Sequence, residues 1–324
     1  MLAAYLFDER RGKVIDDWTD VVGHLHENQV LWVDLVDPSD DDERAVRDGF
    51  ELGEAKFRTP DEGAKPELEL AEDHIRVTAV AVSDEEKDPA REAVVIDCLI
   101  GTNWVLTSHI SDIAVIEDFR TRAEGAGELG ALDAPSFLAT LLEWVVASYS
   151  RAFAEIESTL EEFDVSVLTS PKRETERQVS VLVETRRRIG RLRRSLAPHR
   201  EIFATLSHPE LDLISTERSA ERFEKLTGQI DAALTSATEA KDAVVSSFDI
   251  LIVRTEHRTN EIMKVLTLAS ILFLPGALIA GVMGMNVNFA AGTFSGSPLF
   301  WIVVALIVGI AIATLGVARL RSWI

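Results

Sequence analysis

The residues best suited to chemistry form a stripe of mostly small or polar side chains near the C-terminal end of the chain. They recur at intervals of three and four residues, which places them on one face of an α-helix, while the bulkier Ile271, Phe273 and Ile279 lie off that face. Such a face could line an ion pore, but a close helix–helix seam would show the same pattern, so both interpretations stay open. The stripe consists of Asn260, Met263, Thr267, Ser270, Leu274, Ala277 and Gly281.

The stripe runs into a long uncharged stretch. From Val265 to Ala318 the sequence contains no Asp, Glu, Lys, Arg or His. A membrane span needs about 20 apolar residues, so this stretch can hold two, which we predict over Val265–Met285 and 298–318. The connecting segment, 286–297, is rich in turn-forming residues. A buried helical hairpin of a soluble protein is disfavoured, because soluble helices usually carry a polar face.

Basic residues flank the two predicted spans. Arg254, Arg258 and Lys264 precede the first, Arg319 and Arg321 follow the second, and the connecting loop has no basic residue. The positive-inside rule therefore puts both termini in the cytoplasm and the loop outside. The N-terminus lacks the basic region and the long apolar run of a signal peptide. These features predict a multi-pass protein of the inner or plasma membrane.

Composition narrows the function classes. The chain has 324 residues with 54 acidic and 33 basic side chains, a net charge of −21 that argues against a nucleic-acid partner. Its one cysteine, Cys98, excludes a disulfide framework and lies in an apolar run typical of a core. We find no nucleophile elbow, phosphate loop or zinc-hydrolase motif, so we expect neither enzymatic activity nor an organic cofactor.

The N-terminal part has the pattern of a layered α/β domain. A helix should follow the cap residues Asp37 and Ser39 and run to about Leu52, and a second should span Ile113–Ala123. Strands are predicted at Ala3–Phe7, Val30–Leu35, Glu67–Leu70, Ile75–Val82, Ala93–Ile100 and Trp104–Ser108.

The middle of the chain has helical spacing. One helix should stop before Pro198, and a later one carries a heptad repeat and continues into the first span, to a length of about 100 Å. So long a helix needs neighbours, which favours an oligomeric stalk. The heptad residues are Phe223, Leu226, Ile230, Ala233, Ala237, Ala240 and Val244. The predicted parts are an α/β domain (1–130), antiparallel cytoplasmic helices (131–214), a stalk helix continuing into the first transmembrane helix (215–285), an external loop (286–297), a second transmembrane helix (298–318) and a cytoplasmic tail (319–324).

Two motifs at the ends of the first span resemble the CorA family of divalent-metal channels. Gly284-Met285-Asn286 stands at its outer end and Thr259–Thr267 at its start. The resemblance is residue by residue over 242–286 and one of layout elsewhere. It implies a homopentamer in the lipid bilayer that carries divalent cations, with Mg²⁺ as the transported ion and as a candidate regulator.

The resemblance also implies roles for particular residues. The stripe would line the pore together with Leu266, and Met263, Leu266 and Leu274 would form apolar constrictions that gate by dewetting. Gly284, Met285 and Asn286 would form the outer mouth. There a ring of Asn286 carboxamides would bind Mg²⁺ through the water shell that this ion keeps.

The stalk of this chain matches the family in part. Asp242 and Asp249 match acids of the family's stalk. Lys225, however, falls near the family's metal-sensing acid, with Glu221, Glu224 and Asp231 as uncertain substitutes. Two further departures are Ala277, where many members have Thr, and the absence of acidic residues from the loop after Asn286. The cytoplasmic control of closure by Mg²⁺ and the concentration of cations at the mouth are therefore open.

One cluster is strongly basic: Arg186, Arg187, Arg188, Arg191, Arg193 and Arg194. We interpret it as a solvated face or as partners for acids on adjoining helices, with an anion or lipid contact as the alternative.

The resemblance favours Mg²⁺ influx driven by the membrane potential, with Co²⁺ and Ni²⁺ as further candidate ions. The first alternative is a Zn²⁺ transporter of the ZntB type, with or without proton coupling, which the uncharged loop would suit. His24 and His26 add little to it, because an isolated His-x-His motif is a weak zinc signal. The second alternative is a membrane-anchored sensor that transports nothing.

Overall fold

The computed structural model describes residues 2–8, 11–26, 28–53, 57, 65–83, 92–110, 116–117, 120, 133–169, 175–208, 217–284 and 298–320. The chain divides into two compact units. The first, here the sheet-and-bundle unit, comprises Met1–Ser166 and Pro171–Phe248. The second, here the C-terminal unit, comprises Val167–Ser170 and Asp249–Ile324.

A seven-stranded mixed sheet forms the centre of the sheet-and-bundle unit, in the order β2-β1-β3-β7-β6-β5-β4. Neighbouring strands are antiparallel except β3 and β7, which are parallel. The six predicted strands are all present, and β2 and the short helix α1 were not predicted. The elements are β1 (Leu2–Asp8), β2 (Arg11–Ile15), α1 (Thr19–Val22), β3 (Val30–Val36), α2 (Asp40–Gly49), β4 (Glu67–Leu70), β5 (Ile75–Val82), β6 (Ala93–Ile100) and β7 (Trp104–His109).

Both faces of the sheet are covered. Helix α2 begins at the predicted cap Ser39, which forms a capping box with Asp42, and ends at Gly49 rather than near Leu52. Residues of α2 pack with those of β3 in one apolar core. On the opposite face the ring of Phe137, from helix α4, lies 5.6 Å from that of Trp32 on β3. The predicted helix Ile113–Ala123 lies mainly outside the described residues.

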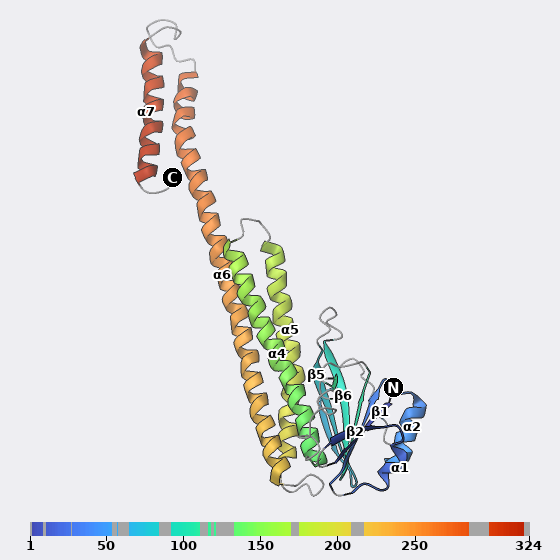
Figure 1. The fold of residues 1–324 in the computed structure, drawn as a ribbon. Helices are drawn as coiled ribbons and strands as arrows, with labels where there is room; N and C mark the ends of the chain where they lie inside the picture. Colours follow the sequence, from blue (N-terminus) through green and yellow to red (C-terminus); the bar gives the residue numbers. More distant parts are fainter. Residues whose placement is uncertain are drawn as a thin grey trace. The chain divides into compact units, whose positions relative to one another are not determined.

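Three long helices lie side by side in the sheet-and-bundle unit: α4 (Ala134–Thr169), α5 (Thr175–Leu206) and the first part of α6 (Glu217–Gly284), as Figure 1 shows. The prediction that one helix stops before Pro198 is wrong, because α5 continues to Leu206. Proline removes one backbone hydrogen bond, but the buried His199, Ile202 and Phe203 beyond it hold the last turns against the core.

The heptad face of α6 is buried within this chain. All seven predicted heptad residues are at most 1% exposed without any second copy. The Nζ atom of Lys225 lies 3.1 Å from an oxygen of Glu143 on α4, and Nε of Arg200 on α5 lies 2.6 Å from an oxygen of Asp231. The heptad residues of α6 therefore face α4 and α5, which supply within one chain the neighbours that this part of the long helix needs.

Side chains of the bundle complete the hydrogen bonding of strand β5. Strand β4 pairs with β5 only along Ile75–Thr78, and among the described residues no other strand pairs with the rest of that edge. The Val80 N–H donates to Nε2 of His199 at 3.1 Å, the Val82 N–H donates to Oγ of Ser148 at 3.0 Å, and Tyr149 donates to the Val80 carbonyl at 2.8 Å. Buried backbone groups need such partners, so these bonds fix α4 and α5 to the sheet.

His199 makes this attachment sensitive to acid. Its Nε2 accepts a hydrogen bond and its Nδ1 lies 3.2 Å from the Leu196 carbonyl, so the ring is neutral. Burial lowers the pKa of His199 to about 4. An unfolded histidine titrates near 6.5, so between pH 6.5 and pH 4 the unfolded chain binds the extra proton.

We therefore expect the stabilisation from neutral His199 to be complete above pH 6.5. As the pH falls to 4, the free energy of unfolding should drop by roughly 3 kcal/mol on this account. Denaturant titrations of the full chain, followed by tryptophan fluorescence across this range, would measure the loss. The His199→Gln variant should show a flatter pH profile, and an unchanged profile would contradict the assignment.

Candidate functional site: the exposed face of α6

The C-terminal unit pairs the last part of α6 with α7 (Pro298–Leu320). Figure 1 shows α7, in red, alongside the orange end of α6. A Cβ atom placed on Gly276 of α6 would lie 3.4 Å from Cγ2 of Ile307 on α7, which marks a close contact between the helices. Leu272 and Ile279, one turn before and after Gly276, are half-buried.

The stripe lies on the opposite side of α6. At 3.6 residues per turn, the centre of the stripe from Thr267 to Gly281 is about 180° round the helix from the face marked by Leu272, Gly276 and Ile279. Every member of the stripe is exposed, and Leu274 is 69% exposed. Leu266, at the edge of the stripe, is also exposed. The stripe is therefore not a seam between α6 and α7 of one chain, which removes one of the two interpretations of its spacing for this pair.

Ser270 shows how the stripe can present oxygen atoms. Its hydroxyl donates to the Leu266 carbonyl at 2.9 Å, within the helix. The proton of the hydroxyl is thus directed inward, and the lone pairs of the oxygen stay free to accept from water or to face a cation.

Helix α6 ends at Gly284, the first residue of the Gly-Met-Asn motif. Met285 and Asn286 lie outside the described residues, so their predicted place at the outer mouth stays a prediction. Among the described residues, α6 contains the one helical segment that is long and apolar enough to cross a membrane, and none of that segment is buried. The apolar stretch described in α7 is shorter, Trp301–Thr314.

The acids considered for a regulatory metal site do not come together in a group that could hold a metal ion in the described part of one chain. Asp242 and Asp249 are both exposed on α6. No group of three His, Cys, Asp or Glu side chains among the described residues could hold a metal ion. Asp231 already pairs with Arg200, which weakens its case as a substitute, whereas Glu221 and Glu224 are exposed. The spacing of acids along α6 could not reveal the ion pair of Asp231, because Arg200 lies on another helix, α5.

Two other predictions can be compared with the structure. Cys98 is fully buried, as predicted, and burial raises the pKa of its thiol well above the usual value. The basic cluster of α5 pairs in part with acids: Arg188 contacts Glu92 and Glu155, and Arg191 contacts Glu92 at 3.1 Å.

A family model described as "CorA-like Mg2+ transporter protein" matches residues 27–318. The chain belongs to this family. Over 323 residues, the CorA-like chain is 24% identical to the cobalt/magnesium transport protein CorA of Methanocaldococcus jannaschii, and the alignment covers 97% of each protein.

Solved structures of similar proteins share the fold of this CorA-like chain. The complete structure of the CorA magnesium transporter from M. jannaschii superposes with a TM-score of 0.78 at 23% identity, covering 99% of this chain and 98% of that one. The structure of full-length CmaX superposes with a TM-score of 0.73 at 19% identity, covering 99% and 97%. The sequence resemblance to the CorA family is thus confirmed, as is the combination of a mixed sheet with a long helix.

Proposed function

We propose that this chain is one subunit of a homopentameric membrane channel that carries Mg²⁺ into the cytoplasm. The observation that carries the proposal is the exposed stripe of α6, which points away from α7. In a ring of five copies the stripes face a common axis, and the α7 helices lie outside them against lipid. The membrane potential drives entry with about 2.3 kcal/mol per charge per 100 mV, and a dication gains twice this.

The proposed channel uses both apolar segments as spans, 265–285 and 298–318, with the loop 286–297 outside and both termini in the cytoplasm. The α/β domain (1–130) and the helices of 131–214 support the stalk, and 319–324 form a cytoplasmic tail. This topology rests on the uncharged stretch and on the basic residues that flank it.

In this channel the narrowest parts of the pore differ in chemistry. At the outer mouth, next to Gly284 and Met285, the Asn286 carboxamides hydrogen-bond the water shell of Mg²⁺ without removing it. Deeper in the pore, the exposed side chains of Met263, Leu266 and Leu274 form apolar rings. Water leaves such rings readily, which closes the path to a hydrated ion. Thr267, Ser270, Ala277 and Gly281 line the pore between these rings and the outer mouth, and Asn260 lines it on the cytoplasmic side of Met263.

Regulation by the transported ion would take place between copies. Asp242 and Asp249 are both exposed on α6. Among the described residues of a single chain, neither belongs to a group of three side chains that could hold a metal ion. Acids from adjacent subunits could share Mg²⁺, which often keeps several waters and few protein ligands.

A flux assay tests this function against its alternatives. Purified full-length protein is placed in liposomes with a potential negative inside, and entry of Mg²⁺, Co²⁺, Ni²⁺ and Zn²⁺ is followed with and without a pH gradient. We expect Mg²⁺ entry that needs the potential and no pH gradient. Zn²⁺ entry without Mg²⁺ entry would favour the ZntB-type alternative, which the uncharged loop 286–297 would suit. A monomer without flux would favour the anchored sensor.

The contact between α6 and α7 gives a structural prediction. Replacing Gly276 with leucine forces the side chain into Ile307, and overpacking of this kind typically costs about 1–3 kcal/mol. We expect Gly276→Leu to lower the melting temperature and the Mg²⁺ flux. Gly276→Ala adds only one methyl group at 3.4 Å and serves as the control.

Combining Gly276→Leu with Ile307→Ala should restore much of the loss, because the second change removes the group that clashes. Failure of this combination to recover any stability would show that the two residues do not touch in the membrane-embedded protein.

A further inference from the structure

A basic groove lies between α5 and α6 in the sheet-and-bundle unit, with a volume of about 910 Å³. This is the size of pockets that hold small organic ligands. Among the described residues, no acidic side chain lines it. Its cations, here the groove cations, are Arg186, Arg187, Arg191, Arg193, Arg194 and Lys241.

The groove cations differ from their neighbours in how they are paired. Arg188, which does not line the groove, is held between Glu92 and Glu155, and Arg191 reaches Glu92. For the other five groove cations, the described part of the chain supplies no ion pair, although the whole chain carries a net charge of −21. Like charges held this close repel one another, and an anion between them removes that cost.

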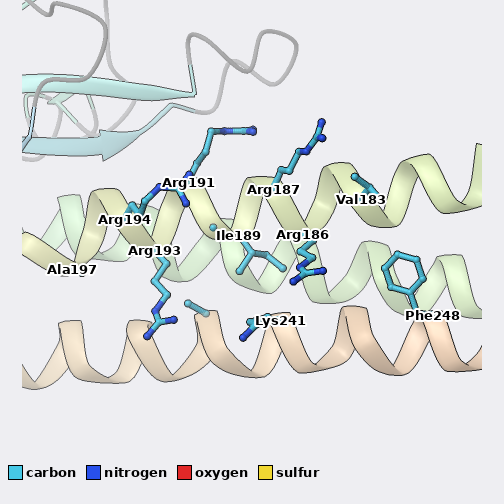
Figure 2. Close-up of a pocket in the computed structure, with 12 residues that line it drawn as sticks. Val183, Arg186, Arg187, Ile189, Arg191, Arg193, Arg194, Ala197, Lys241 and Phe248 are labelled. Atoms are coloured by element: carbon cyan, nitrogen blue, oxygen red, sulfur yellow. The ribbon is translucent and has the colours of Figure 1, made fainter.

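Two of these cations point from α5 toward α6. Figure 2 shows Arg186 and Arg193 of α5 extending toward α6, on which Lys241 also lines the groove. Arg186 and Arg193 are seven residues apart, two turns along the same face of α5. Between them lie the small Gly190 and the buried Ile189, which also lines the groove, and the small Ala237 lines it from α6.

The end of the groove is aromatic. The half-buried ring of Phe248 on α6 lines it beyond Lys241, and Figure 2 shows this ring between the helices. A planar base or another ring can lie against such a side chain, while guanidinium groups bind phosphate oxygens in pairs.

We propose that this groove binds a polyphosphate anion, with a nucleoside triphosphate as the ligand that fits its size and its aromatic end. Arg186, Arg193 and Lys241 hold the phosphates, and Phe248 contacts the base. The shared chemistry is a run of phosphoryl groups, which a nucleotide, an inorganic polyphosphate or a lipid headgroup can supply. The proposal does not depend on the pore, because it concerns another part of the chain.

The test measures binding of ATP, inorganic tripolyphosphate, AMP and inorganic phosphate to the full-length protein by calorimetry, in buffer containing EDTA so that metal binding does not contribute. We expect ATP and tripolyphosphate to bind and AMP and phosphate to bind at least about tenfold more weakly, because they offer fewer charge-assisted hydrogen bonds. Affinity should fall as salt is raised. Absence of ATP and tripolyphosphate binding would overturn the proposal.

Matched variants locate the site. The triple variant R186Q/R193Q/K241Q should bind ATP at least about tenfold more weakly. The control K13Q/K65Q/R151Q removes the same charge from exposed positions that do not line the groove and should bind as the wild type does. Phe248→Ala should weaken ATP binding and leave tripolyphosphate binding unchanged. Equal loss in both triple variants would mean nonspecific attraction and would overturn the site.

Two further arms separate the possible sources. ATP binding that is the same in nanodiscs of zwitterionic and of anionic lipid supports a soluble polyphosphate. Loss of that binding in nanodiscs of anionic lipid, with recovery in zwitterionic ones, supports a lipid headgroup in the same groove. If the groove variant dissociates the oligomer and the wild type binds no ATP, the cations serve contacts between copies and the proposal is wrong.

Discussion

Replacing Asn286 with alanine is expected to lower the initial rate of Mg²⁺ entry into liposomes by at least about a hundredfold. In the proposed pentamer five carboxamides meet at the outer mouth, and each hydrogen bond to a charged group contributes about 1.5–3 kcal/mol. Mg²⁺ polarises the waters bound to it, so their hydrogen bonds to the carboxamides resemble bonds to a charged group. Losing even two such bonds would account for a change of this size. Alanine offers neither a donor nor an acceptor to the waters of the ion.

The matched control is Asn288→Ala, because Asn288 lies two residues further along the same uncharged loop. This change removes the same group from a position outside the Gly-Met-Asn motif and should leave most of the flux. The oligomeric state of both variants is checked by size-exclusion chromatography. Normal Mg²⁺ entry through Asn286→Ala would remove the outer mouth from the proposal, and equal loss in both variants would place the effect in the loop as a whole.

The sequence was most informative where one local pattern determines one structure. The alternating and apolar runs of the N-terminal part located six strands, because such runs have few other stable outcomes. The sequence Arg11–Ile15 is short and begins with two polar residues and a glycine, so it shows no strand pattern by itself. It becomes a strand by pairing with β1, a contact that exists only in the folded chain.

Tertiary contacts decided the points that the sequence left open. The heptad residues of α6 are a true seam, but a heptad repeat does not say whether its partner is another copy or another helix of the same chain. Pro198 is tolerated within α5 because the residues after it are buried. The spacing of the stripe was equally compatible with a seam and a pore. The contact of Gly276 with Ile307 showed which side of α6 is covered.

The functional assignment depends on that exposed face, and a second prediction addresses it directly. Leu274 and Phe273 are adjacent in sequence and are 69% and 70% exposed in the single chain. They point about 100° apart round the helix. If five copies form a ring, Leu274 faces water in the pore, and Phe273 lies at the side of the helix, about 80° from the centre of the stripe.

Single cysteines at these two positions, treated with a water-soluble cationic thiol reagent, will show which side chain faces the pore and which faces lipid or another helix. The native Cys98 can stay in place, because it is fully buried and its raised pKa keeps it from forming the reactive thiolate. Modified Leu274→Cys should pass Mg²⁺ at least about tenfold more slowly, since fixed positive charges in the pore repel a dication. Modified Phe273→Cys should keep its flux.

The comparison is sharp because both side chains are equally accessible before assembly, so a difference between them arises only from the arrangement of the copies. Slower Mg²⁺ entry through modified Phe273→Cys, with no effect at Leu274→Cys, would mean that α6 is rotated about its own axis by about a quarter turn. A different set of residues would then line the pore. No effect at either position would mean that ions do not pass along α6. In that case its small and polar stripe would be a seam between copies, the interpretation that its spacing also allows.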